Sequence, residues 1–142
     1  MEDRPGLALA FSGQVASTRI RKAITGLGLK PGHGHVLLLL SGEGATGQQA
    51  LAETLRVDPS VLVAILNDLE RDGLAERRRD PADRRRHIVS ITEAGKARAA
   101  DLQTAVAAVE ADLFAGLDPE EIATLHRLLT RVTADDTGCV ED

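Results

Sequence analysis

A dense run of arginines lies in the middle of the chain. Six of the ten residues from Arg77 to Arg86 are arginine, in the sequence RRRDPADRRR. With two aspartates the run has a charge of +4, whereas the 142-residue chain carries −5, so the other 132 residues sum to −9. A compact basic segment on an otherwise acidic protein attracts a polyanion, most simply the phosphate backbone of DNA. The run therefore predicts a contact with nucleic acid.

The rest of the composition indicates which kind of nucleic acid is the partner. The chain has two Phe and no Tyr or Trp, so the aromatic platforms on which single strands stack are missing. Double-stranded DNA is favoured for that reason. The sequence contains no phosphate-cradling glycine motif and no nucleophile signature, which predicts a protein that is not an enzyme and needs no cofactor.

The elements that carry the run are predicted to be a helix-turn-helix followed by a β-hairpin. Asp58 is an N-cap followed by proline, and the helix that it opens ends at Gly73. Residues 74–78 and 87–91 are short enough for strands, and β-branched residues favour a strand in the second segment. Residues 80–83 form a turn between them, so the arginines lie on the flanks and tip of a hairpin.

Two helices and a short third are predicted upstream. The apolar spacing over residues 7–27 is helical, and Pro31 suits the first position of a second helix that runs to about Leu40. Thr46 and Gln49 have the spacing of a capping box, which predicts a short helix directly before the turn.

Two amphipathic helices are predicted downstream. Thr92 caps a long helix to about Ala115, and Asp118 with Glu121 forms a capping box for the last helix. The central unit cannot cover all the apolar faces of the outer helices, so a homodimer with interlocking terminal helices is expected. A monomeric helical bundle is the alternative. The dimer stripe predicted on the long helix consists of Leu102, Val106, Val109, Leu113 and Leu117.

An ordered set of motifs runs from about Leu29 to Lys96. It comprises a Leu-Ala pair at Leu51, a Leu-Glu-x-x-Gly-Leu sequence from Leu69, an Arg, an Asp-x-Arg and an aliphatic-Thr-x-x-Gly that ends at Gly95. In this order the motifs resemble the MarR family of bacterial transcriptional regulators. The resemblance implies a mainly α-helical fold with a small β-hairpin, residues 74–91, called the wing below.

The resemblance also implies a domain organisation and a function. It implies a single MarR-like domain over 1–142, with a winged helix-turn-helix DNA-binding lobe at 31–91 and dimerisation helices at 7–27 and 92–134. Many members repress genes from palindromic operators as dimers, and release DNA when a small effector binds between the lobes and the dimer region. Others sense metals, or oxidants through cysteine, and Cys139 is the single cysteine here.

The wing arginines have different expected roles. Arg84 and Arg85 flank the turn, so their guanidinium groups are expected to enter a minor groove, where negative potential is concentrated. By resemblance, Arg77 and Asp83 form a pair that holds the wing in shape. A solvated hairpin that only keeps the protein soluble is the alternative. Phosphate contacts are expected from three further arginines, Arg78, Arg79 and Arg86.

The helix after Asp58 departs from the family pattern. The family has Thr or Ser and an Arg where this chain has Val61, Val63 and Ala64, and residues 58–72 carry a charge of −3. Bidentate reading of guanine is therefore not expected from this helix. The alternative for its apolar surface is a protein-interaction module with only non-specific DNA affinity. The expected DNA contacts are thymine methyl groups at Val61, Val63 and Ala64, a phosphate at Ser60, and a base or phosphate at Asn67.

Histidines and two further arginines give candidates for an effector site. His33 and His35 are two residues apart, which places them on different faces of a helix, and close cysteines are missing, so no metal site is predicted. His35, Arg19 and Arg21 are the candidate ligand contacts, provided that they face a cavity. The longest apolar run, residues 36–40, cannot span a bilayer, and no signal peptide is evident, so a cytoplasmic protein is expected.

Overall fold

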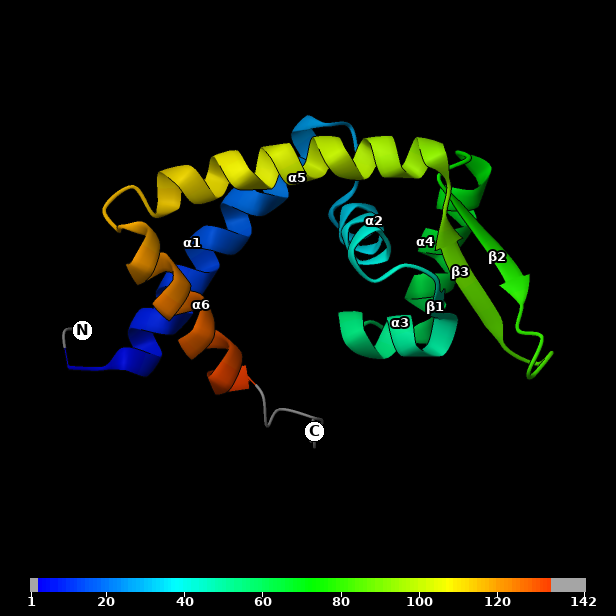
Figure 1. The fold of residues 1–142 in the computed structure, drawn as a ribbon, viewed down its shortest axis with the longest axis horizontal. Coiled ribbons are helices and arrows are strands. Elements are labelled where there is room, and N and C mark those ends of the chain that lie inside the picture. Colours follow the sequence, from blue (N-terminus) through cyan, green and yellow to red (C-terminus); the bar gives the residue numbers. More distant parts are fainter. Residues whose placement is uncertain (1–2, 134–142) are drawn as a thin grey trace. The chain divides into compact units, whose positions relative to one another are not determined.

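The computed structural model describes residues 3–133, and Cys139 lies outside that range. Helices dominate this part of the chain, and three short strands interrupt them (Figure 1), which confirms the predicted mainly helical class. None of these helices has the length and apolar character that crossing a bilayer requires. The elements are α1 Pro5–Gly26, α2 Pro31–Glu43, β1 Thr46–Gly47, α3 Gln48–Leu55, α4 Pro59–Arg71, β2 Ala75–Arg79, β3 His87–Ile91, α5 Glu93–Leu113 and α6 Pro119–Thr133.

The chain forms two compact units that divide between Val109 and Glu110, inside α5. The first unit has an aliphatic core around α2, which is apolar on nearly every side and contacts α1, α3, α4 and β3. Gly34 allows the close approach of α1, because a Cβ there would lie 2.7 Å from Ile24 Cγ2. The largest fully buried side chains are Ile24, Val36, Leu37, Leu40, Leu51, Leu62, Leu66, Leu69, Val89 and Leu102.

The sheet has three antiparallel strands in the order β1-β3-β2, one more than the hairpin that the sequence predicts. The third strand is β1, whose residue Thr46 pairs with Val89. The predicted capping box at Thr46 and Gln49 is therefore wrong: Gly47 is the N-cap of α3, and it has no side-chain cap. The hydroxyl of Thr46 donates to the Gly44 carbonyl oxygen instead, over 2.9 Å.

The ends of α4 and the start of α5 fix the base of the wing. The Asp58 carboxylate caps α4, and Gly73 beyond its end has a φ of +72°, as the sequence predicts for both. The Thr92 hydroxyl accepts a hydrogen bond from the Gly95 amide over 3.0 Å and donates to the Gly73 carbonyl oxygen over 2.7 Å. The predicted cap at Thr92 therefore also ties the end of β3 to the end of α4.

The second unit contains the end of α5 and the whole of α6. Its predicted capping box is confirmed, because Asp118 and Glu121 each accept a hydrogen bond from the other's amide, over 2.8 and 3.0 Å. Leu102, which lies in the first unit, is fully buried in that unit's core and so does not belong to a free dimer stripe. Exposed large apolar side chains on or next to α6 include Leu117, Leu128 and Val132.

Candidate nucleic-acid interface

The tip of the wing, residues 80–86, is held by its own short-range hydrogen bonds. The Asp80 amide donates to the Arg86 carbonyl oxygen over 2.9 Å, and the Asp80 carboxylate accepts from the Ala82 amide over 2.9 Å. The Asp83 carboxylate accepts from the Arg85 amide over 3.1 Å. Such contacts between an aspartate and the backbone two residues on stabilise tight turns. The arginines of the tip therefore project from an ordered turn.

The structure replaces the expected Arg77–Asp83 pair with two separate contacts. Asp83 binds the Nε atoms of Arg85 and Arg86, over 3.1 and 3.6 Å, and the bond from Arg85 holds the pKa of Asp83 below its ordinary value. Arg77 pairs with Glu70 of α4. The physical reason is position: Arg77 lies in the middle of β2, opposite Val89, whereas Asp83 lies in the tip beyond the strands.

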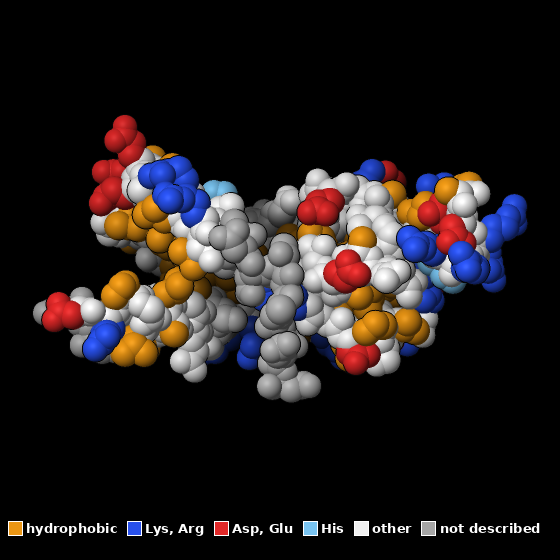
Figure 2. All heavy atoms as spheres, turned by 90° about the horizontal axis from the view of Figure 1, so that it is seen from below, with side chains coloured by type: hydrophobic (Ala, Val, Ile, Leu, Met, Phe, Trp, Pro, Cys, Tyr) orange, Lys and Arg blue, Asp and Glu red, His pale blue; other side chains and the backbone are white. Residues whose placement is uncertain are grey.

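The remaining wing arginines are available to an external anion. Within residues 3–133 the guanidinium groups of Arg78 and Arg84 have no hydrogen-bonding or ionic partner. The Arg85 side chain is 91% exposed even though it pairs with Asp83. Arg79 donates to the Arg84 carbonyl oxygen over 2.9 Å, which ties the strand to the tip. Figure 2 shows blue Lys and Arg side chains gathered at the end of the molecule that carries β2 and β3.

The outward face of α4 is mostly apolar. Val61 and Val63 are 49% and 37% exposed, and Ala64 is exposed beside them. The opposite face packs into the core through Leu62, Ile65, Leu66 and Leu69. The three residues predicted to contact thymine methyl groups are therefore exposed to solvent on one helix.

The N-terminus of α4 already holds a negative charge. The Asp58 carboxylate accepts from the Ser60 amide over 2.9 Å and from the Ser60 hydroxyl over 2.7 Å, and these bonds lower the pKa of Asp58. A phosphate at Ser60 would therefore have to displace the contact with Asp58. The sequence identified both residues, but the competition between them depends on the geometry.

Asn67 is exposed on α4, yet its side chain is not free. Its Oδ1 atom accepts a hydrogen bond from Arg77 Nη2 over 2.5 Å, while Arg77 Nε binds the Glu70 carboxylate. Arg77 thus links the middle of β2 to two side chains of α4, and its own side chain is only 21% exposed. Sequence reasoning missed this link, because Glu70 and Arg77 are far apart in any local pattern.

His33 of α2 binds Asp68 of α4. Its Nε2 atom lies 2.9 Å from Asp68 Oδ2, and this bond is the main cause that lowers the pKa of Asp68. Arg71 also contacts Asp68, over 3.1 Å. No group of three or more His, Cys, Asp or Glu side chains within residues 3–133 is arranged to hold a metal ion.

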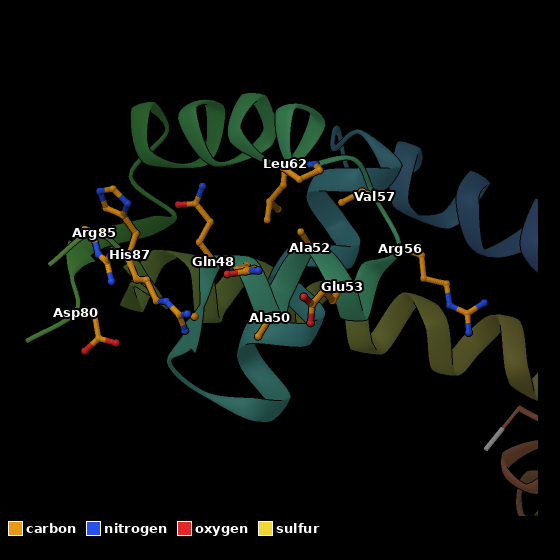
Figure 3. Close-up of a pocket in the computed structure, with 14 residues that line it drawn as sticks. Gln48, Ala50, Ala52, Glu53, Arg56, Val57, Leu62, Asp80, Arg85 and His87 are labelled. Carbon is orange, nitrogen blue, oxygen red and sulfur yellow. The ribbon is translucent and has the colours of Figure 1, made fainter. Parts of the chain in front are cut away.

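A groove of about 630 Å³ opens between α3, the turn before α4 and the wing. Figure 3 shows Asp80, Arg85 and His87 of the wing on one side and the side chains of α3 on the other. The candidate effector residues Arg19, Arg21 and His35 do not line it and are exposed on α1 and α2. Sequence reasoning missed the groove, because the pairing of β1 with β3 is what brings α3 beside the wing.

Comparisons with known proteins agree on one family. A model described as the MarR family matches residues 27–86. A protein of Thauera aromatica, described as a transcriptional regulatory protein for the hcr operon, is 35% identical over 127 residues, which cover 88% of this chain and 76% of that protein.

Two solved structures share the fold. CouR from Rhodococcus jostii RHA1 bound to p-coumaroyl-CoA matches with a TM-score of 0.79 and 25% identity, over 92% of this chain and 92% of that one. A mutant of MarR from E. coli complexed with operator DNA matches with a TM-score of 0.74 and 25% identity, over 89% of this chain and 91% of that one.

Proposed function

The chain belongs to the MarR family of DNA-binding transcriptional regulators, and on this premise we propose that it is a homodimeric repressor of a palindromic operator, released by a small-molecule effector. The observation that carries the proposal is the ordered wing tip, whose exposed arginines stand beside an exposed, uncharged stretch of α4. The first surface suits the DNA backbone or minor groove, and the second suits base edges.

In this proposal the wing supplies most of the affinity. Arg84 and Arg85 enter the minor groove, while Arg78, Arg79 and Arg86 reach phosphates. The Arg84 guanidinium needs no internal contact broken before it binds DNA, which supports its role. When DNA binds, the Arg85 guanidinium leaves the Asp83 carboxylate and contacts a phosphate or the minor groove.

The outward face of α4 supplies the base contacts. Val61, Val63 and Ala64 pack against the methyl groups of thymine, the one apolar group that the major groove presents. Ser60 contacts a phosphate by turning its hydroxyl away from Asp58. The lobe that carries out this reading spans residues 31–91.

Dimerisation is proposed through the terminal helices, 7–27 and 92–134. Leu7 and Phe11 of α1 are 56% and 59% exposed, and Val132 of α6 is 62% exposed. Large apolar side chains at such exposure mark an interaction surface. A palindromic operator also requires a two-fold arrangement of two lobes.

An effector is proposed because a related fold, that of CouR, was solved with p-coumaroyl-CoA bound. In this chain Arg19, Arg21 and His35 are the candidate contacts for an anionic ligand. A ligand that binds the DNA-free form better than the DNA-bound form lowers the affinity for DNA by that ratio of affinities.

Fluorescence anisotropy tests the proposal. A labelled duplex from directly upstream of the gene is compared with a scrambled duplex of the same composition, each over a salt series. Tighter binding to the upstream duplex with a steep salt dependence supports a specific regulator. Equal and weak binding to both duplexes would overturn it and favour the rival function, a winged-helix module in which Val61 and Val63 meet a protein.

The dimer and the effector have separate tests. Light scattering after gel filtration should give twice the chain mass of 15.1 kDa, and a mass of one chain would exclude the dimer. A screen of small carboxylates and their thioesters for release of the labelled duplex tests the effector. Arg19→Ala should raise the concentration needed for release, and an unchanged concentration would remove Arg19 from the site.

A further inference from the structure

We propose that Asn67 reads DNA bases only as a hydrogen-bond donor, because Arg77 and Glu70 fix the orientation of its side-chain amide. The inference rests on the proposed function, in which α4 lies along the base edges of the major groove. It makes Asn67 a residue that determines specificity. Arg77 and Glu70 are positioning residues, which act on DNA sequence through Asn67.

The first step is the chemistry of the contact between Asn67 and Arg77. The two ends of an asparagine amide look alike in shape, so its orientation has to be decided by its partners. A guanidinium group has five N–H donors and no acceptor. The atom of Asn67 that lies 2.5 Å from Arg77 Nη2 must therefore be the oxygen. The NH₂ group then points away from Arg77.

The second step is that Arg77 cannot move aside easily. Its Nε atom binds Glu70, which lies three residues after Asn67 and so on the same side of α4. Its backbone lies in β2, in register with the fully buried Val89. The Arg77 side chain is only 21% exposed, and its bonds connect β2 to α4.

The third step is the position of Asn67 on α4. It lies three and four residues after Ala64 and Val63, so it continues the same exposed stripe by one helical turn. That stripe presents methyl groups at Val63 and Ala64. The NH₂ group of Asn67 adds a polar contact to a surface that otherwise recognises shape and methyl groups.

The consequence is that adenine loses its usual advantage and cytosine is disfavoured. Asparagine normally recognises adenine with both ends of its amide, the oxygen accepting from N6 and the nitrogen donating to N7. Here the oxygen faces Arg77, so the NH₂ group contacts the base edge and donates to one acceptor: O6 or N7 of guanine, O4 of thymine or N7 of adenine. The major-groove edge of cytosine presents only an amino group, which places donor against donor and leaves both unsatisfied. At one base pair of each half-site, cytosine should therefore be disfavoured at the position that faces Asn67.

The test is selection from a pool of duplexes with a randomised 20-base-pair centre, using the full-length protein. The wild type is compared with Asn67→Leu, Arg77→Met and Arg78→Met. Arg78 is the matched control, because it is the next residue of β2 and has the same charge but no hydrogen bond or ion pair with a described residue of α4. Thermal unfolding by circular dichroism checks that Arg77→Met and Asn67→Leu both fold, because each removes one side of the contact between Asn67 and Arg77.

The wild type should enrich a motif in which one position of each half-site disfavours cytosine by about fivefold and shows no preference for adenine over guanine or thymine. Asn67→Leu should erase that preference and leave the rest of the motif. Arg77→Met should shift the position toward adenine, because the amide is then free to turn, whereas Arg78→Met should weaken binding with the motif unchanged.

Two results would overturn the inference: an Asn67→Leu motif identical to that of the wild type, or a wild-type preference for adenine over guanine and thymine at the position that Asn67→Leu changes. If the wild type enriches no motif at all, the proposed sequence-specific function fails, and this inference fails with it. The two failures are therefore distinguishable from the wild-type motif alone.

Discussion

The wing and the outward face of α4 are neighbours in one lobe, yet their chemistry is opposite. Residues 77–86 carry a charge of +4 and expose guanidinium groups, whereas residues 58–72 carry −3 and expose two valines. Contacts to phosphates give affinity that depends on salt and hardly on sequence, while contacts to base edges give sequence preference. This chain therefore divides affinity and selectivity between two elements.

The two regions are also held in place differently. The wing tip is fixed by the local contacts of Asp80 and Asp83, whereas α4 is fixed by four side chains in the core. Arg77 is the side-chain link between them. Changes near the base of the wing should therefore disturb both regions at once, and changes at either surface should disturb only one.

The largest effect is expected from Gly95→Ala, which should disturb the placement of the wing and of α4 together. A Cβ at Gly95 would lie 2.1 Å from the Leu74 carbonyl oxygen and 2.6 Å from Ile91 Cγ1. Because the first of these is backbone, α5 must shift away from the base of the wing. The free energy of unfolding should fall by about 3 kcal/mol, and DNA binding should weaken for every sequence. Urea unfolding followed by circular dichroism measures the first effect.

Gly13→Ala is the control for that substitution. Gly13 lies within α1, and a Cβ there meets nothing within 4 Å. Alanine should raise helix stability by about 0.5–1 kcal/mol. Equal unfolding free energies for the two variants would show that the joint between α5 and the wing is not tight.

The next largest effect is expected from removing the wing charges alone. Arg84→Ala with Arg85→Ala should weaken binding at least about tenfold and reduce the steepness of the salt dependence, because two cationic side chains are removed from the contact with DNA. The ratio between specific and scrambled duplex should change little. Arg19→Ala with Arg21→Ala removes the same charge from α1 and should leave both quantities nearly unchanged. Anisotropy over a salt series measures the affinity and its salt dependence. Unchanged affinity in the wing variant would contradict the proposal that the wing supplies most of the affinity.

How far the sequence predicts these regions depends on how local their causes are. The N-cap at Asp58, the turn at Gly73 and the cap at Thr92 each depend on residues within a few positions, and the structure confirms them. The buried face of α4 follows from helical periodicity alone. At these positions the sequence is read correctly, because the cause of each feature lies within one turn of helix or one tight turn.

Contacts between distant elements were not predictable in the same way. The strand at Thr46 is two residues long, and only its partner β3 defines it, so the local signal favoured a helix cap. Resemblance assigned Arg77 to Asp83, but the strand register directs Arg77 to Glu70. The groove beside the wing depends on a distant contact as well. Because α3 comes directly after β1 along the chain, the pairing of β1 with β3 places α3 beside the wing.

A smaller effect is expected at the base-reading surface. Val61→Ala with Val63→Ala should reduce the preference for the upstream duplex by about fourfold per lost methyl contact, from about 0.8 kcal/mol for each buried methyl group. The salt dependence should stay unchanged. This is the opposite of the wing variant, which should change the salt dependence and leave the sequence preference. Replacing thymine by deoxyuridine in the same duplex removes the methyl groups from the DNA side. If deoxyuridine weakens the wild type and the double variant equally, the valines do not contact thymine.

The smallest effect is on stability in acid, and it tests the N-terminal cap of α4 independently of the rest of the lobe. The hydrogen bonds from Ser60 hold the pKa of Asp58 below its ordinary value of 3.8, so the folded state favours the carboxylate. That stabilisation is present above pH 3.8 and is lost as the pH falls through the lowered pKa. The melting temperature should therefore drop more in acid than it would without this group.

Asp58→Asn tests this, because asparagine caps a helix about as well as aspartate but does not titrate. Its melting temperature at pH 7 should match the wild type closely, and its decline between pH 5 and about pH 2 should be shallower. Asp83 has a lowered pKa for a different reason, its bond with Arg85, so Asp83→Asn should loosen the wing tip and leave the cap of α4 intact. Parallel acid profiles for wild type and Asp58→Asn would show that the cap contributes no pH-dependent stability.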